Sequence, residues 1–457
     1  MKAHVSVALA VLAGCGTPLR PGAPAADQNG PAVDIESPVA LTFAPEPQRD
    51  SQLEPLDVRS GTAAGPEHSL TVVQSESGNA LPISFGLPQA AVTDVDALTS
   101  TFAGYWMAAA VVANGSQAGS YVLVGTRDPQ PGTGRDIIVE KYNAAGVMQW
   151  QRVINGAANG DDYGAAVAVE SAGAAIYVGG GIWDSDENER DAFLRKYDSN
   201  GNVQWTRTVD GTYNDSDIIN GIALDESGNG VVVAGVLRNR PHYPAYNDAY
   251  GARYTSSGAL VWSFTHNGAG NQHDAFNSVA VDGNGNAGFG GFTSLTADPS
   301  YARYTAYARL MSRTGALVWE GTFPRSNGGT STIREVSYNN GIWAAAVSNN
   351  DPGENGGAIA RYTTAGQVLS WWEVSDVTPR SVAVSSSGSL YVAGDSVPGG
   401  TFRLGRVVNG AWAWQATNQP TGYGYGVAVT GNRLVAAGFS AANGAISPYW
   451  LVFSSLP

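Results

Sequence analysis

Residues 191–205 read DAFLRKYDSNGNVQW, and residues 222–235 read IALDESGNGVVVAG. The first stretch contains a basic residue, an aromatic residue, a short polar gap, a glycine and then a tryptophan. This element recurs six times, strictly or loosely, with successive glycines 55, 57, 57, 51 and 44 residues apart, at Gly146, Gly201, Gly258, Gly315, Gly366 and Gly410. Self-similarity at a nearly fixed period indicates a repeat architecture.

The second stretch contains two short apolar strands separated by a glycine-rich turn. It recurs seven times between the copies of the first element, beginning at Met107, Val167, Ile222, Val279, Glu335, Val382 and Val427. Each period therefore holds about four short strands, separated by turns rich in Gly, Asn and Asp. Strands at this spacing, in a period of about 50 residues, are typical of the blades of a β-propeller.

The repeats predict an all-β fold, a single β-propeller of seven four-stranded blades over residues 70–457. The last copy lacks the glycine–tryptophan strand, so an N-terminal strand within residues 70–105 is expected to complete that blade. Leu70–Gln74 and Leu81–Phe85 are the candidate strands. Such closure joins the two ends of the repeat array and removes exposed sheet edges. The repeated Trp is expected to pack across the seam between neighbouring blades.

Residues 1–14 have the pattern of an export signal, with Lys2 before a short apolar run. The run is shorter than the roughly 20 residues that a membrane-spanning helix needs. Its end resembles the bacterial lipobox, in which small residues precede a Cys, at Leu12, Ala13, Gly14 and Cys15. The resemblance implies cleavage before Cys15 and acylation of that residue. The alternative is a plain secretory signal with an incidental Cys.

Two or three acyl chains on Cys15 would hold the protein stably at a membrane, since a single chain binds only marginally. Gly16, rather than Asp, follows Cys15. By the same resemblance, this implies an outer-membrane lipoprotein that faces the periplasm or the cell surface. Residues 15–69 hold nine of the 23 Pro and little apolar periodicity. Such a segment cannot bury enough surface to offset its ordering entropy, so a disordered tether is predicted.

The composition excludes several classes of protein. One Cys excludes a disulfide scaffold and a thiolate zinc site. The chain has 25 Lys and Arg against 39 Asp and Glu, a formal net charge of −14, so no nucleic-acid partner is expected. The 58 Gly and the 43% of hydrophobic residues favour many short strands and tight turns. No cofactor is predicted.

Residues 191–205 and 222–235 together resemble the SBBP-type β-propeller repeat of bacterial exported lipoproteins. The resemblance covers roughly residues 105–453 and is strongest in the second to fourth copies. It implies a propeller and export, and no common activity. The spacing of Asp, Gly and Trp is also similar to that of PQQ-like repeats, whose members include outer-membrane assembly scaffolds and which have eight blades and a shorter period.

Three Asp residues recur just before the first strand of a repeat, at Asp162, Asp217 and Asp274. Each follows an Asn by three residues and precedes the strand motif by five. In a propeller these carboxylates are expected to crown one end of the central channel, where grouped carboxylates bind a cation or a polyol. The alternative is that each accepts backbone N–H groups and holds its own turn.

Two loops begin like calcium-binding loops: Asp184, Asp186 and Asn188 in one, and Asp282, Asn284 and Asn286 in the other. Both loops lack the Gly at the sixth position and the Glu at the twelfth, so solvated turns are the alternative. His266 and His273 lie near Asp274 in one loop and form a further candidate for a metal or acid–base pair.

The sequence carries no Gly-x-Ser-x-Gly elbow, P-loop or His-Glu-x-x-His motif. We therefore predict a non-enzymatic binding or scaffold domain, held at the cell envelope through Cys15, with a protein or glycan ligand at an end face of the propeller. One alternative is a glycoside hydrolase or lyase that uses carboxylates in the central funnel. The other is an outer-membrane assembly scaffold similar to the PQQ-repeat lipoproteins.

Overall fold

A computed structural model describes most of the chain from residue 95 onward. The described residues are 95–99, 104–128, 134–183, 190–211, 217–225, 227, 230–238, 246–296, 304–323, 329–339, 341–349, 356–374, 376–396, 400–408, 411–416, 421–430, 433–442 and 445–453. The predicted signal, the lipobox with Cys15, the tether and both candidate closing strands lie outside these ranges.

The described chain forms seven antiparallel sheets of four strands each. The first blade contains β2 (Gly104–Val111), β3 (Tyr121–Arg127), β4 (Asp136–Tyr142) and β5 (Met148–Ile154). The second contains β6 (Tyr163–Val169), β7 (Ala175–Ile182), β8 (Asp191–Asp198) and β9 (Val203–Val209). The third contains β10 (Ile218–Asp225), β11 (Gly230–Leu237), β12 (Asp248–Thr255) and β13 (Leu260–His266). The fourth contains β14 (Ala275–Val281), β15 (Ala287–Ser294), β16 (Tyr304–Met311) and β17 (Leu317–Phe323).

The remaining blades follow the same plan. The fifth contains β18 (Ser331–Asn339), β19 (Ile342–Asn349), β20 (Gly357–Tyr362) and β21 (Val368–Val374). The sixth contains β22 (Val377–Val384), β23 (Leu390–Ser396), β24 (Phe402–Val408) and β25 (Ala411–Gln415). The seventh contains β26 (Gly422–Thr430), β27 (Arg433–Ala442), β28 (Ala445–Phe453) and β1 (Val95–Thr99). One short 3-10 helix, η1 (Gly115–Gln117), joins β2 to β3.

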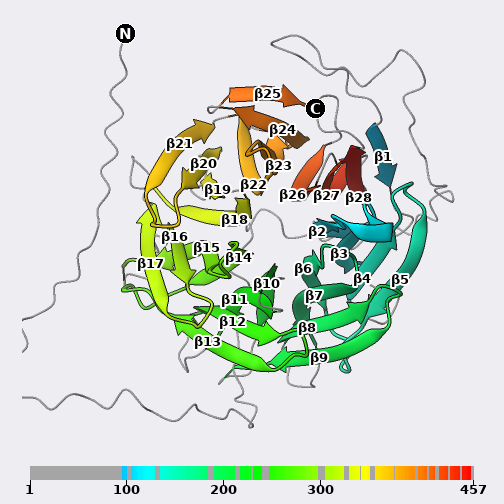
Figure 1. Ribbon diagram of the computed structural model, residues 1–457, viewed down its shortest axis with the longest axis horizontal. Helices are drawn as coiled ribbons and strands as arrows, with labels where there is room; N and C mark the ends of the chain where they lie inside the picture. Colours follow the sequence, from blue (N-terminus) through cyan, green and yellow to red (C-terminus); the bar gives the residue numbers. More distant parts are fainter. Residues whose placement is uncertain are drawn as a thin grey trace, which may run out of the picture. The chain divides into compact units, whose positions relative to one another are not determined.

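The seven sheets are arranged in a ring around a central axis (Figure 1). In the view down this axis, β2, β6, β10, β14, β18, β22 and β26 lie innermost. Each of these inner strands contacts the inner strand of the next blade, and β26 contacts β2 to complete the ring. This arrangement confirms the predicted single propeller of seven four-stranded blades.

The last blade is completed by a strand from the N-terminal side of the repeats, as predicted. β1 pairs with β28 in antiparallel register, from Val95 opposite Phe453 to Thr99 opposite Tyr449. It takes the outermost place in the sheet, which is the place of the glycine–tryptophan strand that the last repeat lacks. The closing strand lies within residues 70–105 but after both stretches that the sequence offered for it.

All seven inner strands carry a β-bulge at the same place. In each, the pairing with the second strand skips one residue, for example between Trp106 and Ala108 in β2 and between Pro379 and Ser381 in β22. The skipped residues are Met107, Ala165, Asn220, Asn277, Arg334, Arg380 and Tyr425. We call these the bulge residues. In five blades this residue lies two positions before the first residue of the repeated triplet, at Val167, Ile222, Val279, Val382 and Val427. In the first and fifth blades the bulges align the triplet at Ala109 and Val336, and not at Met107 and Glu335.

A glycine in the second half of the second strand is explained by this bulge. In β11, a Cβ on Gly235 would lie 2.2 Å from the carbonyl oxygen of Ile218 on the inner strand. In β15, a Cβ on Gly291 would lie 1.8 Å from the carbonyl oxygen of Ala275. No side chain fits at such distances, so the close backbone approach requires glycine. Part of the glycine excess therefore follows from the repeated bulge.

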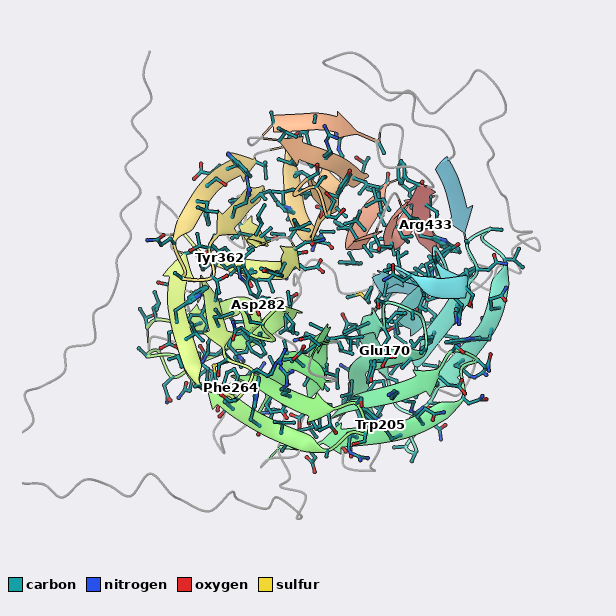
Figure 2. All side chains as sticks on the ribbon, viewed as in Figure 1. Glu170, Trp205, Phe264, Asp282, Tyr362 and Arg433 are labelled. Carbon is teal, nitrogen blue, oxygen red and sulfur yellow. The ribbon has the colours of Figure 1, made fainter. Side chains whose placement is uncertain are left out.

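The repeated Trp packs across the seam to the next blade, as expected. Trp205 of the outermost strand β9 (Figure 2) donates its indole N–H to the carbonyl oxygen of Ser256 at 3.0 Å, and its ring covers Gly258 in the same turn. Gly258 has a positive φ of 85°, and a Cβ there would lie 3.0 Å from the ring. The same contact joins Trp150 to Ser199, Trp262 to Arg313 and Trp319 to Thr364. Four consecutive seams thus share one design.

Candidate functional site

A cavity of about 100 Å³ lies in the channel at the centre of the ring. Residues of all seven inner strands line it, and the lining includes every one of the seven bulge residues. A bulge releases a residue from the ladder and re-aims its side chain. The seven bulges therefore place seven side chains around one small space, which we call the channel cavity.

The bulge residues divide the channel cavity into two unlike arcs. On the first and second blades the lining is apolar, with Met107 and Ala165 at the bulges and Ala109 and Val167 beside them. From the third blade to the seventh the bulge residues are polar or aromatic: Asn220, Asn277, Arg334, Arg380 and Tyr425. Glu335, next to a bulge residue, is the carboxylate among the described lining residues. Aliphatic side chains line the polar arc too, at Ile222, Val279 and Val427. A ligand would therefore meet aliphatic carbon on both arcs, and amides and charges on the polar arc.

The two Asn side chains of the polar arc also tie neighbouring blades together. The amide nitrogen Nδ2 of Asn220 donates to the carbonyl oxygen of Phe276 at 3.2 Å. Nδ2 of Asn277 donates to the carbonyl oxygen of Ile333 at 2.8 Å and to Oγ1 of Thr332 at 3.0 Å. Both residues are buried. These bonds fix the amide groups at the wall of the cavity.

Arg380 is held firmly where it lines the cavity. Its Nε donates to Oδ1 of Asp395 on the neighbouring strand β23, and both side chains are buried. Its guanidinium lies 4.8 Å from the ring centre of Tyr423 and 5.5 Å from that of Tyr425. Ion pairing and stacking on aromatic rings are typical of an Arg that is preorganised for an interaction.

Glu335 is tied to the next blade through a hydroxyl group. The Oγ of Ser381 donates to Oε2 of Glu335 and accepts the backbone N–H of Val427 at 2.8 Å. The carboxylate is thus oriented by a contact that also links the fifth, sixth and seventh blades. An acid held in this way presents a fixed negative charge at the polar arc.

The three recurring Asp carboxylates hold their own loops. Asp162 accepts the backbone N–H of Gly156 at 2.7 Å and that of Trp183 at 2.6 Å. Asp217 accepts the N–H of Gly211 at 2.7 Å, and Asp274 accepts those of Gly268 and Ser294 at 2.9 Å. These contacts agree with the alternative stated for these residues, in which each Asp accepts backbone N–H groups and holds its own turn. None of the three is among the residues that line the channel cavity; a ligand on this ring stays a prediction.

Burial changes the acidity of these carboxyl groups. Asp162, Asp217 and Asp274 are each no more than 1% exposed. Loss of hydration raises the pKa of Asp162 to about 6 and that of Asp274 to about 6, and the N–H donors oppose this only in part. Burial also holds the pKa of Asp217 well above its usual value.

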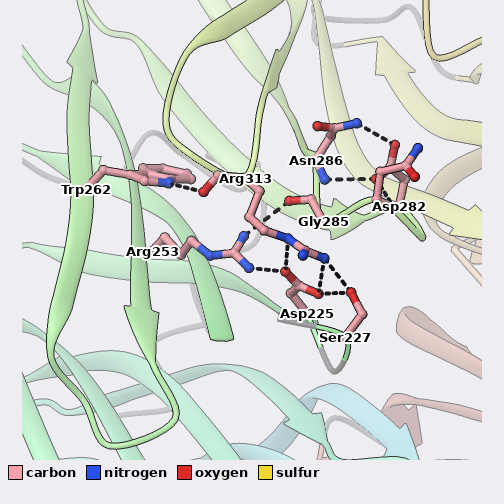
Figure 3. A network of polar contacts seen from close by, with 9 residues as sticks. Asp225, Ser227, Arg253, Trp262, Asp282, Gly285, Asn286 and Arg313 are labelled. Carbon is pink, nitrogen blue, oxygen red and sulfur yellow. Dashed lines mark hydrogen bonds and ion pairs between the residues drawn. The ribbon is translucent and has the colours of Figure 1, made fainter. Parts of the chain in front are cut away.

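The calcium-like loops are represented by one described example. Oδ1 of Asp282 accepts the backbone N–H groups of Asn284 and Asn286, and its Oδ2 accepts the side-chain amide of Asn286 at 2.9 Å (Figure 3). This carboxylate therefore closes its own turn. The residues of the other loop, Asp184, Asp186 and Asn188, lie outside the described residues. Within the described ranges, no group of three His, Cys, Asp or Glu side chains lies close enough to hold a metal ion.

Figure 3 also shows an ionic cluster at the seam between the third and fourth blades, in which Asp225 and Arg253 are buried and Arg313 is 40% exposed. Asp225 at the end of β10 lies between Arg253 of the same blade and Arg313 in a turn of the next blade. The Nε of Arg313 is 3.0 Å from Oδ2 of Asp225. All three side chains are used in holding the two blades together, so this cluster has a structural role.

The two His residues, His266 and His273, pack against different aromatic side chains. His266 stacks on Tyr307 with ring centres 4.4 Å apart, and its Nε2 lies 3.2 Å from Oγ1 of Thr293. His273 packs edge-on against Tyr246. Burial lowers the pKa of His266 to about 4 and that of His273 to about 4. Both imidazoles are therefore neutral at physiological pH. His266 is connected to Asp274 through Thr293, whose Oγ1 donates to Oδ1 of Asp274 at 2.6 Å.

Sequence reasoning missed the bulge residues. A bulge is defined by the pairing of the backbone and tolerates many side chains. No residue type therefore predicts its position in the sequence. One signal was present in the repeats. When the seven copies are aligned on the triplet, the triplet reads Val-Ala-Val in four of them, whereas the position two residues earlier is Met, Ala, Asn, Arg or Tyr. A variable position inside a repeating motif marks the site where the copies differ in role.

The ring, the bulges and the channel cavity define the chain as a seven-bladed β-propeller. No protein-family model matches the chain, and no curated protein is similar to it in sequence. In the described residues, no helix is long and apolar enough to cross a membrane.

Solved structures resemble the chain in fold. The WD40 β-propeller domain of Doa1 is 12% identical over 79% of this chain and 96% of its own, with a TM-score of 0.44. The β-propeller domain of the Trilobed protease from Pyrococcus furiosus is 8% identical over 77% of this chain and 94% of its own, with a TM-score of 0.48. The sialidase of Trypanosoma rangeli is 10% identical over 68% of this chain and 57% of its own, with a TM-score of 0.44. At these identities we take neither activity nor partner from them.

Proposed function

We propose that the chain is an exported, lipid-anchored β-propeller that binds a ligand in its channel cavity without transforming it. The observation that carries this proposal is the variation at the bulge residues. Seven structurally equivalent positions face one cavity and carry five different residue types, while the triplets beside them repeat. A purely structural position in a repeat is expected to stay uniform, whereas a binding site needs different groups on its different sides.

The polar arc supports binding because its groups are fixed before a ligand arrives. Asn277, Arg380 and Glu335 are each held by hydrogen bonds to neighbouring strands or blades. Groups held in this way lose little conformational freedom on binding, so more of each contact contributes to affinity. Hydrolysis of a glycoside by the usual route uses a pair of carboxyl groups, whereas Glu335 stands with amides and guanidinium groups. The hydrolase and assembly-scaffold alternatives stay predictions.

The proposed location rests on the N-terminal sequence. Leu12-Ala13-Gly14-Cys15 supports acylation of Cys15, and Gly16 supports sorting to the outer membrane. The resemblance to SBBP-type repeats of exported lipoproteins supports the same location. Labelling cells with a fatty-acid probe tests this part. Label is expected on the wild-type protein and should be lost in Cys15→Ser; label that persists in this variant contradicts acylation at Cys15.

Binding is tested with the full-length protein in mild detergent, against panels of small molecules, glycans and envelope proteins. Ala109→Leu extends a side chain from the apolar arc into the channel cavity and is expected to abolish binding of the true ligand. Ala145→Leu, an exposed turn position outside the cavity, is the matched control. A ligand that binds wild type and Ala109→Leu equally well would place the binding site elsewhere.

A further inference from the structure

The channel cavity combines charges of both signs with an aliphatic wall. Arg334 and Arg380 bring positive charge, and Glu335 brings negative charge. Asp395, which pairs with Arg380 from the next strand, makes the four groups neutral together. Opposite them lie Met107, Ala109 and Val167 of the apolar arc. A ligand that satisfies every side of this space has both charges and a short apolar part.

We propose that the channel cavity binds a small zwitterionic amino acid with an aliphatic side chain. This inference rests on the proposed function of the same cavity and names its ligand class. The α-carboxylate lies toward Arg334 and Arg380, the α-ammonium group lies toward Glu335, and the side chain packs on the apolar arc.

The carboxylate end follows from the chemistry of the two Arg residues. A guanidinium group presents a planar set of N–H donors that matches the two oxygens of a carboxylate. Arg334 and Arg380 are bulge residues of adjacent blades, so both line the same side of the channel cavity. The contacts of Arg380 with Asp395, Tyr423 and Tyr425 keep its guanidinium in place.

The ammonium end follows from Glu335. A simple carboxylate ligand would bring a like charge toward this residue, and like charges in a confined space repel. An α-ammonium group two bonds from the carboxylate carbon removes that conflict and adds a charge-assisted hydrogen bond. The amide groups of Asn220 and Asn277 add polar surface between the charged ends.

The size of the cavity limits the side chain. An engineered cavity of about 150 Å³ holds benzene, which has six heavy atoms, so a space of about 100 Å³ encloses about four heavy atoms by the same ratio. The smallest amino acids come near this size, and part of a glycine or alanine molecule would extend beyond the cavity along the channel. The aliphatic wall formed by Met107, Ala109 and Val167 favours alanine, because its methyl group buries apolar surface that glycine lacks.

The test compares ligands on the unaltered full-length protein by isothermal titration calorimetry and by the shift in thermal midpoint. L-Alanine is expected to bind. Propionate keeps the carboxylate alone and ethylamine keeps the ammonium group alone, so each should bind about 10- to 100-fold more weakly, the effect of one charge-assisted hydrogen bond. Since these comparisons need no variant, they do not depend on whether a substituted chain folds.

Variants of the lining residues then test which residue binds the carboxylate and which binds the ammonium group of the ligand. Arg334→Gln should weaken L-alanine about 10- to 100-fold and leave ethylamine unchanged. Glu335→Gln should weaken L-alanine by a similar factor and leave propionate unchanged or improve it. Arg195→Gln, on β8 outside the lining residues, is the matched control and should bind as wild type does.

Propionate that binds as tightly as L-alanine would overturn the zwitterion, as would L-alanine affinity unchanged in Arg334→Gln. Absence of L-alanine binding, with another ligand that Ala109→Leu excludes, would overturn this inference and leave the proposed function standing. If no ligand of any panel depends on Ala109, both proposals fail.

Discussion

The seams among the first five blades differ from the seam that closes the ring between the seventh blade and the first. In the former, an outer-strand Trp such as Trp205 covers a turn glycine of the next blade and donates to the carbonyl of Ser256. In the closing seam, the equivalent carbonyl, that of Ala144, accepts a guanidinium N–H of Arg433 at 2.6 Å. The same turn is thus held by a different side chain where the repeat array meets its own start.

The closing seam is also anchored more deeply. The rings of Trp106 and Trp450 meet edge to face with centres 6.1 Å apart, and Tyr142 lies 5.5 Å from Trp450. Trp450 is fully buried, whereas Trp205 is half-buried. Joining segments more than 300 residues apart costs more chain entropy than joining neighbouring repeats. The difference indicates that the closure depends on this buried aromatic contact, where the repeat seams add an outer-strand Trp over a turn glycine.

The largest effect is therefore expected from Trp450→Ala. Removing a fully buried Trp leaves a cavity, and such changes cost about 3–5 kcal/mol of unfolding free energy. Denaturant unfolding followed by fluorescence and circular dichroism measures the loss. A loss no greater than that of Trp205→Ala would contradict the idea that the closing seam carries more of the stability.

The middle of the repeat region, the second to fourth blades, differs from the rest of the ring in the position five residues before the strand triplet. In the second, third and fourth blades this position holds Asp162, Asp217 and Asp274, all buried. In the fifth and sixth blades it holds Ser331 and Val377, and in the seventh and first it holds Gly422 and Gly104. Buried carboxyl groups at this position are therefore confined to one part of the ring.

A pH dependence of stability is expected from these carboxyl groups. Folding raises the pKa of Asp162 and of Asp274 to about 6, while an unfolded Asp titrates near about 4. The protonated form is favoured in the folded state, so the stabilisation is present below about pH 4 and is lost as the pH rises through about 6. The loss amounts to at most about 3 kcal/mol per carboxyl group.

Denaturant unfolding across this pH range tests the expectation. Asp162→Asn and Asp274→Asn should each flatten the dependence, because an amide does not titrate. Asp128→Asn removes a carboxylate that is 42% exposed and serves as the control for the loss of one negative charge. The raised pKa of Asp274 would be contradicted if the free energy of unfolding rose with pH between about 4 and 6 and if Asp274→Asn showed the same pH dependence as wild type.

The sequence predicted the blade count because the turn glycines and seam Trp residues recur at nearly equal spacing, and each has one physical reason to be where it is. It also predicted closure by an N-terminal strand, because the last copy lacked its outer strand. It did not select Val95–Thr99. A five-residue strand has a weak pattern of its own, and its pairing with β28 is decided by tertiary position.

The candidate site was less accessible to sequence reasoning. The recurrence of the three Asp residues suggested a ligand site. Contacts that hold a turn through backbone N–H groups produce the same recurrence. The bulge residues are identified only by the pairing of β-strands, and Arg334 and Arg380 show no common motif with Met107. Their meeting in one cavity follows from closure of the ring, which joins positions separated by hundreds of residues.

A moderate effect is expected from Trp205→Ala in a repeat seam. The change removes the indole hydrogen bond to Ser256, the edge contact with Tyr177 and the cover over Gly258. Because the ring is half-buried, the expected loss is about 2 kcal/mol. Hydrogen exchange should show faster opening in the second and third blades than in the sixth. Each repeat seam is expected to open on its own. A uniform loss of protection around the ring would contradict this expectation.

The smallest effect is expected from Arg433→Gln, which removes the guanidinium from the closing seam while Trp450 and β1 remain. Its bond to Ala144 lies at the surface, where solvent screening limits charged contacts to about 1 kcal/mol or less. The matched change in a repeat seam is Arg207→Gln, since Arg207 donates to the carbonyl of Gly258 at 2.8 Å beside Trp205. The two variants should lose similar small amounts of unfolding free energy, because each surface bond serves a turn that buried contacts already place. A loss for Arg433→Gln as large as that for Trp450→Ala would mean that the exposed guanidinium, and not the buried aromatic contact, holds the ring closed.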